Sequence, residues 1–186
     1  MIVQELRREE IEQIWSIDRR EVIDHVYYLR DGELVLEPEH YDMAGWPPGE
    51  QDHYQPILYD CFDRGGTFWG AFDDSRLVAA AVLESKFIGR QRDRLQLKFL
   101  HVGRPYRKAG LGRELFAIAV AKATELGARS LYISATPSEN TVDFYRHLGC
   151  VLTSEVDPEL YALEPEDIHL AYAIPDTQTL RISENP

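Results

Sequence analysis

The chain has 186 residues, enough for one compact domain with a sizeable core, and 44% of them are hydrophobic. Three Trp, ten Tyr and seven Phe argue against an intrinsically disordered chain. The net charge of -12 excludes nucleic acid as the expected partner, because phosphate would be repelled overall. The same charge would attract a cationic substrate, although solubility alone explains it equally well.

The compartment follows from the N-terminus and the cysteines. The first residues are amphipathic and charged, and no apolar run reaches membrane-spanning length, so we expect a cytoplasmic protein with no membrane partner. Cys61 and Cys150 stand alone in apolar surroundings, which is typical of reduced, buried thiols. The six His residues lack metal-ligand spacing, so no metal site is expected. The sequence does not determine the oligomeric state and is compatible with a homodimer.

The N-terminal part begins with a strand pattern and a helix pattern. Residues 2–6 alternate between apolar and polar side chains, which predicts a short strand. Residues 8–19 predict a helix with acidic residues near its start. Its apolar stripe consists of Ile11, Ile14, Trp15 and Ile17.

A hairpin, a loop and a second helix are expected next. An Asp-Gly turn at 31–32 separates two apolar runs and predicts a β-hairpin. Residues 37–50 are aromatic, acidic and rich in proline, and read as an irregular loop. Such a loop either lines a binding cleft or covers the surface. Residues 50–64 predict a helix that tolerates Pro56 only near its start.

From residue 65 onward the pattern is that of a β-meander leading into a long helix. Residues 67–72, 77–87 and 95–102 predict three strands separated by turns. Apolar residues then recur at helical spacing over 111–126, and Gly127 follows as the expected C-terminal cap.

The C-terminal part returns to short strands. Residues 131–135 predict a strand, and residues 141–148 predict a short helix capped by Ser138 or Asn140. Two more short strands are expected at 150–156 and 168–174, with an acidic connection between them.

This order of elements predicts an α/β fold with one mixed, mostly antiparallel sheet flanked by helices. The strands before and after the long helix should be parallel neighbours joined by a right-handed crossover. We expect a single domain over 1–186, with a variable N-terminal part at 1–64 and a core at 65–175.

A basic loop follows the strand that ends at Val102. A glycine-rich turn between a strand and a helix favours anion binding, because the first turn of the helix presents unpaired N–H groups and the positive end of its dipole. The loop lacks both GxxxxGK[ST] and a full GxGxxG. A solvated basic turn capping a core helix is the alternative. The basic and glycine residues are Arg104, Arg107, Lys108, Gly110, Gly112 and Arg113.

The run from Arg107 to Gly112 reads R-x-x-G-x-G and resembles the signature of the GCN5-related N-acetyltransferase (GNAT) family. The resemblance covers residues 65–175 and implies a GNAT-like acyl-CoA N-acyltransferase fold with acetyl-CoA as the cofactor. It implies that backbone amides of the loop hold the pyrophosphate and that the edge of the preceding strand binds the pantetheine. The implied cofactor-binding residues are Leu100, His101, Val102, Arg107, Lys108, Ala109, Gly110, Leu111, Gly112, Arg113 and Asn140.

Residues 138–149 resemble a later motif of the same family, in which an Asn precedes F/Y-Y-x-x-x-G-F, with Asn140, Phe144, Tyr145 and Gly149 as the matching residues. The match implies that Asn140 contacts the cofactor and that Tyr145 protonates the leaving thiolate as a general acid. Read without the family, Tyr145 is a core aromatic and Asn140 a helix cap. Cys150 stands where the family usually has an aromatic residue, which suggests a change in packing.

The general base is the least defined part of the expected site. Some members use a Glu on the strand before the loop, but the corresponding residue here is Gln96, which cannot accept the proton. Glu84 on the preceding strand is the catalytic candidate, with His101 or a water chain to carboxylates as alternatives. No cysteine has a neighbouring base, so direct attack in a ternary complex is expected.

The sequence therefore predicts an N-acetyltransferase that moves an acetyl group from acetyl-CoA to a primary amine of a small cationic metabolite, drug or peptide. Acidic residues in 31–52 and 155–167 are candidate walls of the acceptor site, or a solvated acidic face. A non-catalytic acyl-CoA-binding regulatory module is the alternative function, and a nucleotide hydrolase is a third.

Overall fold

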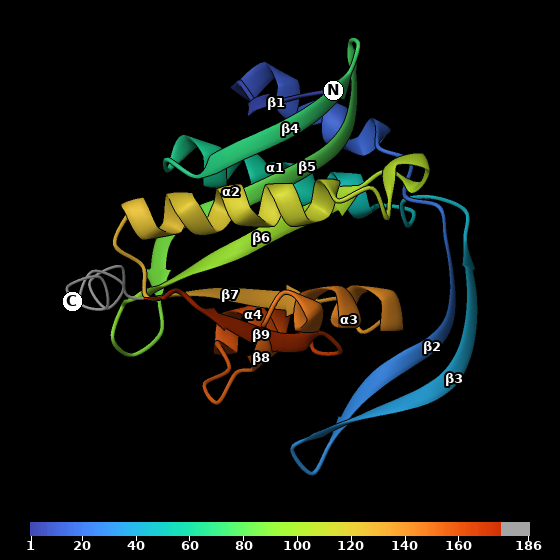
Figure 1. The fold of residues 1–186 in the computed structure, drawn as a ribbon, viewed down its shortest axis with the longest axis vertical. Helices are drawn as coiled ribbons and strands as arrows, with labels where there is room; N and C mark the ends of the chain where they lie inside the picture. Colours follow the sequence, from blue (N-terminus) through green and yellow to red (C-terminus); the bar gives the residue numbers. More distant parts are fainter. Residues whose placement is uncertain (176–186) are drawn as a thin grey trace, which may run out of the picture.

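The computed structural model describes residues 1–175 (Figure 1). A seven-stranded sheet in the order β1-β4-β5-β6-β7-β9-β8 forms its centre, and β2 and β3 form a separate hairpin. The strands are β1 Ile2–Glu5, β2 Glu21–Arg30, β3 Glu33–Met43, β4 Thr67–Asp73, β5 Arg76–Ile88, β6 Arg94–Val102, β7 Ser130–Ala135, β8 Val151–Leu152 and β9 Ile168–Ala173. The helices are α1 Glu50–Asp63, α2 Leu111–Glu125, α3 Glu139–His147 and α4 Pro158–Leu163, with 3₁₀ helices η1 Arg8–Ser16 and η2 Arg104–Tyr106.

The mixed α/β fold predicted from the sequence is confirmed. Within the seven-stranded sheet, every pair of neighbours is antiparallel except β6 and β7, which run parallel with Leu95 opposite Leu131. Helix α2 makes the crossover between them and packs against β5, β6 and β7. Gly127, at φ +88°, ends this crossover helix as expected, because glycine adopts the left-handed conformation without steric cost.

Strand β5 divides the hydrophobic core into two layers. Its successive side chains point to opposite faces of the sheet. Ala81 and Leu83 pack with α2 residues such as Leu115, whereas Val82 packs on the other face with η1 and α1 residues such as Ile11. The sheet is thus covered on both faces, and its N-terminal layer is built from the residues before 65.

The first helix differs from the sequence prediction in its type and its end. Residues 8–16 form a 3₁₀ helix rather than a longer helix reaching residue 19. Its buried side chains, Ile11, Ile14 and Ile17, recur every third residue, which matches the three residues per turn of a 3₁₀ helix. Trp15 lies off that stripe and is only partly buried.

The predicted loop at 37–50 is wrong over its first half, because β3 continues to Met43. Pro38 interrupts the hydrogen bonds between β2 and β3 only locally. Both strands of a two-stranded hairpin are edge strands, and the register already shifts opposite Pro38, between Ile23 and His25, so the missing N–H is tolerated there. In α1, Pro56 lies well inside the helix rather than near its start. Burial of Leu58 and Cys61 against the sheet holds this helix despite the lost backbone hydrogen bond.

Two further differences lie near the C-terminus. The strand expected at 150–156 shortens to β8, because the Thr153 hydroxyl accepts the Glu155 N–H at 3.2 Å and turns the chain. The acidic connection contains α4, whose N-cap Asp157 accepts N–H groups of Glu159 and Leu160 at 3.0 and 3.1 Å. The last predicted strand is confirmed as β9.

Among residues 1–175, none of the helices combines the length and apolar character needed to cross a membrane. The same residues contain no group of three or more His, Cys, Asp or Glu side chains placed to hold a metal ion. Cys61 and Cys150 are free, and burial raises the pKa of each thiol to about 12.

Candidate functional site

Strands β6 and β7 diverge toward their C-terminal ends. They pair only from Arg94–Gln96 to Ser130–Tyr132. Beyond this point a register shift against β5 leaves Lys98 as a bulge residue, which bends β6 away from its neighbour. A cleft of about 1930 Å³ opens between the two strands, and Leu100–Val102 line it with an edge that has no strand partner on the β7 side.

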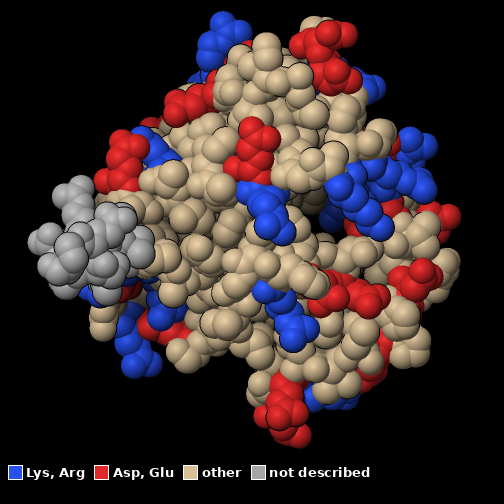
Figure 2. All heavy atoms as spheres, in the orientation of Figure 1, with Lys and Arg blue, Asp and Glu red and all other residues tan. Residues whose placement is uncertain are grey.

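The loop after β6 presents a row of backbone donors at the mouth of this cleft. Lys108 and Gly110 adopt positive φ angles of 63° and 90°, which turn the chain into α2. In the part of the chain that the structure describes, the N–H groups of residues 108–113 have no acceptor. Figure 2 shows Lys and Arg side chains gathered around a hollow on this side of the molecule, and Lys108 and Arg113 belong to the cleft lining.

Arg107 fixes the loop against the rest of the site. Its Nε donates to the carbonyl of Val102 at 3.0 Å, and its Nη1 lies 3.6 Å from a carboxylate oxygen of Glu21 on the hairpin. Arg107 therefore braces the loop against the end of β6 and the hairpin. A row of free N–H groups beside an unpaired strand edge fits the diphosphate and the extended amide chain of acetyl-CoA.

The structure brings most of the predicted cofactor residues together around the cleft. Ala109 and Leu111 do not line it: Ala109 is exposed, and Leu111 is buried in the core beneath α2. Their contribution to the proposed anion site is limited to their backbone N–H groups, which have no acceptor among the described residues. The predicted residues that line the cleft are Leu100, His101, Val102, Arg107, Lys108, Gly110, Gly112, Arg113 and Asn140.

Tyr145 on α3 is both a core residue and a cleft residue. Its ring packs against Phe116 and Phe144, with centroids at 6.3 and 5.1 Å, and its side chain also lines the cleft. Burial, reinforced by Cys150 and Asp167, raises the pKa of the phenol above its ordinary value. The hydroxyl therefore stays protonated over the whole neutral range and has a proton to donate.

Asn140 is not the cap of α3. Ser138 occupies the N-cap position, with its hydroxyl bonded to Thr141, and Asn140 Nδ2 donates to Glu21 Oε1 at 3.2 Å. This contact joins α3 to the hairpin. A second hydrogen bond links the hairpin to the segment before α3: the Tyr27 backbone N–H donates to the carbonyl of Pro137 at 2.7 Å.

Glu84 lies outside the cleft lining, although it is buried. Its carboxylate receives two hydrogen bonds from Arg64, at 2.9 and 3.1 Å, and lies 3.6 Å from Lys98 Nζ. Burial opposes its charge, but Arg64 and Lys98 outweigh burial and hold its pKa below the ordinary value. A carboxylate paired in this way is a poor base, and its evident role is to hold the β6 bulge.

Replacing Glu84 with Gln is therefore expected to lower the free energy of unfolding by about 2–3 kcal/mol, because it leaves the charges of Arg64 and Lys98 without their counter-ion. Arg64 is partly exposed, so water screens its charge and limits the loss of stability to this range. Urea unfolding measures it. Any activity of the folded variant should keep the pH profile of the wild type, and a profile that lost its acidic limb would make Glu84 the base.

His101 stands at the floor of the cleft within an aromatic cluster. Its ring lies 4.3 Å from Phe99 and 4.9 Å from Trp46 between centroids. Burial, together with the nearby charges of Arg19 and Arg107, lowers its pKa to about 3. The imidazole is thus neutral at physiological pH and takes up a proton poorly.

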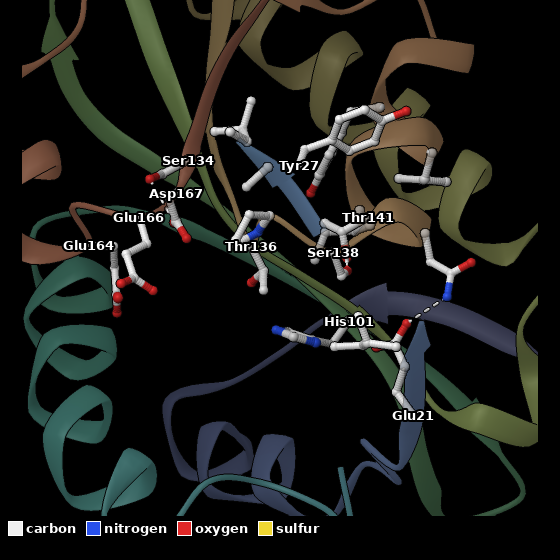
Figure 3. A pocket seen from close by; sticks show the side chains of 18 of the residues that line it. Glu21, Tyr27, His101, Ser134, Thr136, Ser138, Thr141, Glu164, Glu166 and Asp167 are labelled. Atoms are coloured by element: carbon white, nitrogen blue, oxygen red, sulfur yellow. Dashed lines mark hydrogen bonds between the residues drawn. The ribbon is translucent and has the colours of Figure 1, made fainter. Parts of the chain in front are cut away.

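The sequence did not single out Ser134, Thr136 or Asp167, which line the cleft where β7 ends and β9 begins (Figure 3). Asp167 falls within the acidic segment expected to form an acceptor wall, but its position opposite β7 depends on the sheet pairing. The only local signal is an acidic residue directly before a strand. Nor did the sequence show that the β2–β3 hairpin closes the cleft through Tyr27.

Comparison with known proteins agrees with this architecture. The model of the acetyltransferase (GNAT) family matches residues 9–150, whereas no curated protein matches in sequence. A nourseothricin acetyltransferase has a similar structure, with TM-score 0.69 and 20% identity over 94% of this chain and 98% of that one. So does a protein assigned as a streptothricin acetyltransferase from Bacillus anthracis, in complex with acetyl coenzyme A (TM-score 0.70, 17% identity, 94% and 98% covered).

A third similar structure is PaiA N-acetyltransferase from Thermoplasma acidophilum in complex with coenzyme A, with TM-score 0.61 and 15% identity over 93% of this chain and 99% of that one. Identities this low establish a shared fold. The family match extends over most of the chain and includes the braced loop and the Tyr145 motif. The chain therefore belongs to the GNAT acetyltransferase family and is an acetyltransferase that uses acetyl-CoA.

Proposed function

We propose that the enzyme acetylates a primary amine on a small acceptor that carries more than one positive charge. The observation that carries this proposal is the acidic end of the cleft. Figure 3 shows Glu164, Glu166 and Asp167 together on one side of the pocket, away from Glu21. Glu50 of α1 and Glu39 of the hairpin line the same cleft.

Tyrosines hold two of these carboxylates, Glu164 and Glu39, in place. The hydroxyl of Tyr54 donates to Glu164, and the hydroxyls of Tyr28 and Tyr41 donate to Glu39. Carboxylates fixed among aromatic rings suit an ammonium group, which gains both ion pairing and contact with the ring faces. The names of the nourseothricin and streptothricin acetyltransferases support a small-molecule acceptor.

At the opposite end, the N–H groups of residues 108–113 would bind the diphosphate of acetyl-CoA, and the Leu100–Val102 edge would bind its amides. The cofactor supplies the activated acetyl thioester. Tyr145 would donate its proton to the departing sulfur, since its phenol lines the cleft and stays protonated. Neither Cys61 nor Cys150 serves as a nucleophile at a thiol pKa of about 12, which supports direct attack by the amine.

A matched pair of amines tests the acceptor class. We expect 1,5-diaminopentane to react with acetyl-CoA at least about 10-fold faster in kcat/KM than pentylamine, because only the diamine presents a second cation to the acidic end. Thiol release measures both rates, and added salt should narrow the ratio. Equal rates would contradict a polycationic acceptor. Tight coenzyme A binding without turnover of any amine would favour the non-catalytic acyl-CoA-binding module.

A further inference from the structure

Asp167 occupies a distinctive place in the cleft. It directly precedes β9, where Ile168 pairs with Ala135 at the end of β7, so its carboxylate lies where β6 and β7 have diverged. Its Oδ2 accepts a hydrogen bond from the Ser134 hydroxyl at 2.8 Å, and its second oxygen has no partner among the described residues. Figure 3 shows the carboxylate beside Ser134 and turned toward the open pocket.

The groups around Asp167 make it a stronger base than an ordinary carboxylate. Burial raises its pKa to about 6; the Ser134 hydrogen bond opposes the rise, and the charges of Glu164 and Glu166 on its own segment add to it. The groups that face it from other elements are the phenols of Tyr132 on β7 and Tyr145 on α3.

We propose that Asp167 is the catalytic base that takes the proton from the acceptor ammonium. The proposal rests on the acetyltransferase function argued above. Asp167 first takes one proton from the ammonium and releases it to the water of the open cleft. The nitrogen lone pair of the resulting amine forms the new C–N bond to the acetyl carbon, and the nitrogen gives its second proton to Asp167 as the C–S bond breaks. Tyr145 gives its proton to the departing sulfur, and the proton held by Asp167 then restores the phenol.

The other candidates in or near the cleft fit this role less well. Glu164 is bound by the Tyr54 hydroxyl, and Glu166 is exposed. His101 has a pKa of about 3, far below the working range of a base. Glu84 is bound by Arg64 and lies outside the cleft lining. Among the described carboxylates and histidines that line the cleft, Asp167 alone combines a free oxygen, a position at the diverging strands and a pKa near neutrality.

The test is the variant Asp167→Asn assayed with acetyl-CoA and 1,5-diaminopentane. We expect kcat/KM to fall by about 10²–10³-fold. In the wild type kcat/KM should fall as the pH drops through about 6, because Asp167 becomes protonated, and the variant should lack this limb. Calorimetry should give the variant the coenzyme A affinity of the wild type. Glu159→Gln, on the exposed surface of α4, is the matched acidic control and should change none of these values.

Two further measurements do not depend on the reaction rate of Asp167→Asn. Ser134→Ala removes the hydrogen bond that lowers the pKa of Asp167, so the acidic limb should move to higher pH. Carbon NMR of the aspartate carboxyls, without any substrate, should show one resonance that titrates near pH 6 and is absent from Asp167→Asn.

The outcomes separate the two proposals. An acidic limb that persists unchanged in Asp167→Asn, or that stays in place in Ser134→Ala, overturns the assignment of the base while leaving the acetyltransferase intact. Absence of any turnover by the wild-type enzyme, across cationic and neutral amines, overturns the proposed function and the base together. A limb lost in Asp167→Asn and shifted in Ser134→Ala supports Asp167.

Discussion

Replacing Tyr145 with Phe is expected to lower kcat by about 10²-fold while coenzyme A affinity changes by less than about twofold. The variant keeps the ring that packs against Phe116 and Phe144 and removes only the hydroxyl. A thiolate is a moderately good leaving group, with a pKa about 1.5 below that of a phenol, so the loss should stay at the low end of general-acid effects.

Tyr172→Phe is the matched control for this prediction. Tyr172 on β9 also packs against Phe116, with ring centroids 5.2 Å apart, but it does not line the cleft. Its variant should retain the wild-type kcat. Similar losses in both variants would assign the effect to packing around Phe116, and an unchanged kcat in Tyr145→Phe would remove the phenol from the mechanism. Thiol release and calorimetry with coenzyme A supply the two measurements.

Features that depend on short stretches of sequence were predictable. The anion-binding loop is a local structure, because a strand, two glycines at the turn and a helix N-terminus follow one another within a few residues. The parallel pairing of β6 and β7 likewise follows from the crossover through α2. Tyr145 was predicted through the family motif, since spacing alone does not distinguish a core aromatic from a cleft residue.

Features that depend on contacts between distant elements were not predictable. Glu84 looked available as a base because its partners, Arg64 and Lys98, come from other elements and are recognisable only in the folded chain. Asp167 acquires its environment from Ser134 across a strand pair. The 3₁₀ form of η1 was missed for a related reason: a stripe of apolar residues reads as a helix, and only burial shows its three-residue period.

The loop proposed to bind the diphosphate should be the most sensitive point for cofactor binding, and Gly112→Asp is expected to weaken coenzyme A binding by at least about 10²-fold. A carboxylate at this position meets the diphosphate at close range, where repulsion of about 3 kcal/mol corresponds to that loss. It also competes for the same N–H groups. The Gly112→Asp variant should still fold, because an acidic residue in the first turn of α2 interacts favourably with the helix dipole.

Gly112→Ala is the control that separates the effect of the added charge in Gly112→Asp from the effect of adding any side chain at this position. A Cβ at residue 112 would lie 3.2 Å from two ring atoms of Phe144, a contact that a small shift of the ring relieves. The alanine variant should therefore lose no more than about threefold in coenzyme A affinity. Calorimetry with coenzyme A measures both variants, and thermal unfolding checks that they fold. If Gly112→Asp bound coenzyme A as tightly as Gly112→Ala, the diphosphate would have to lie elsewhere, because two like charges cannot share one row of donors without a loss of affinity.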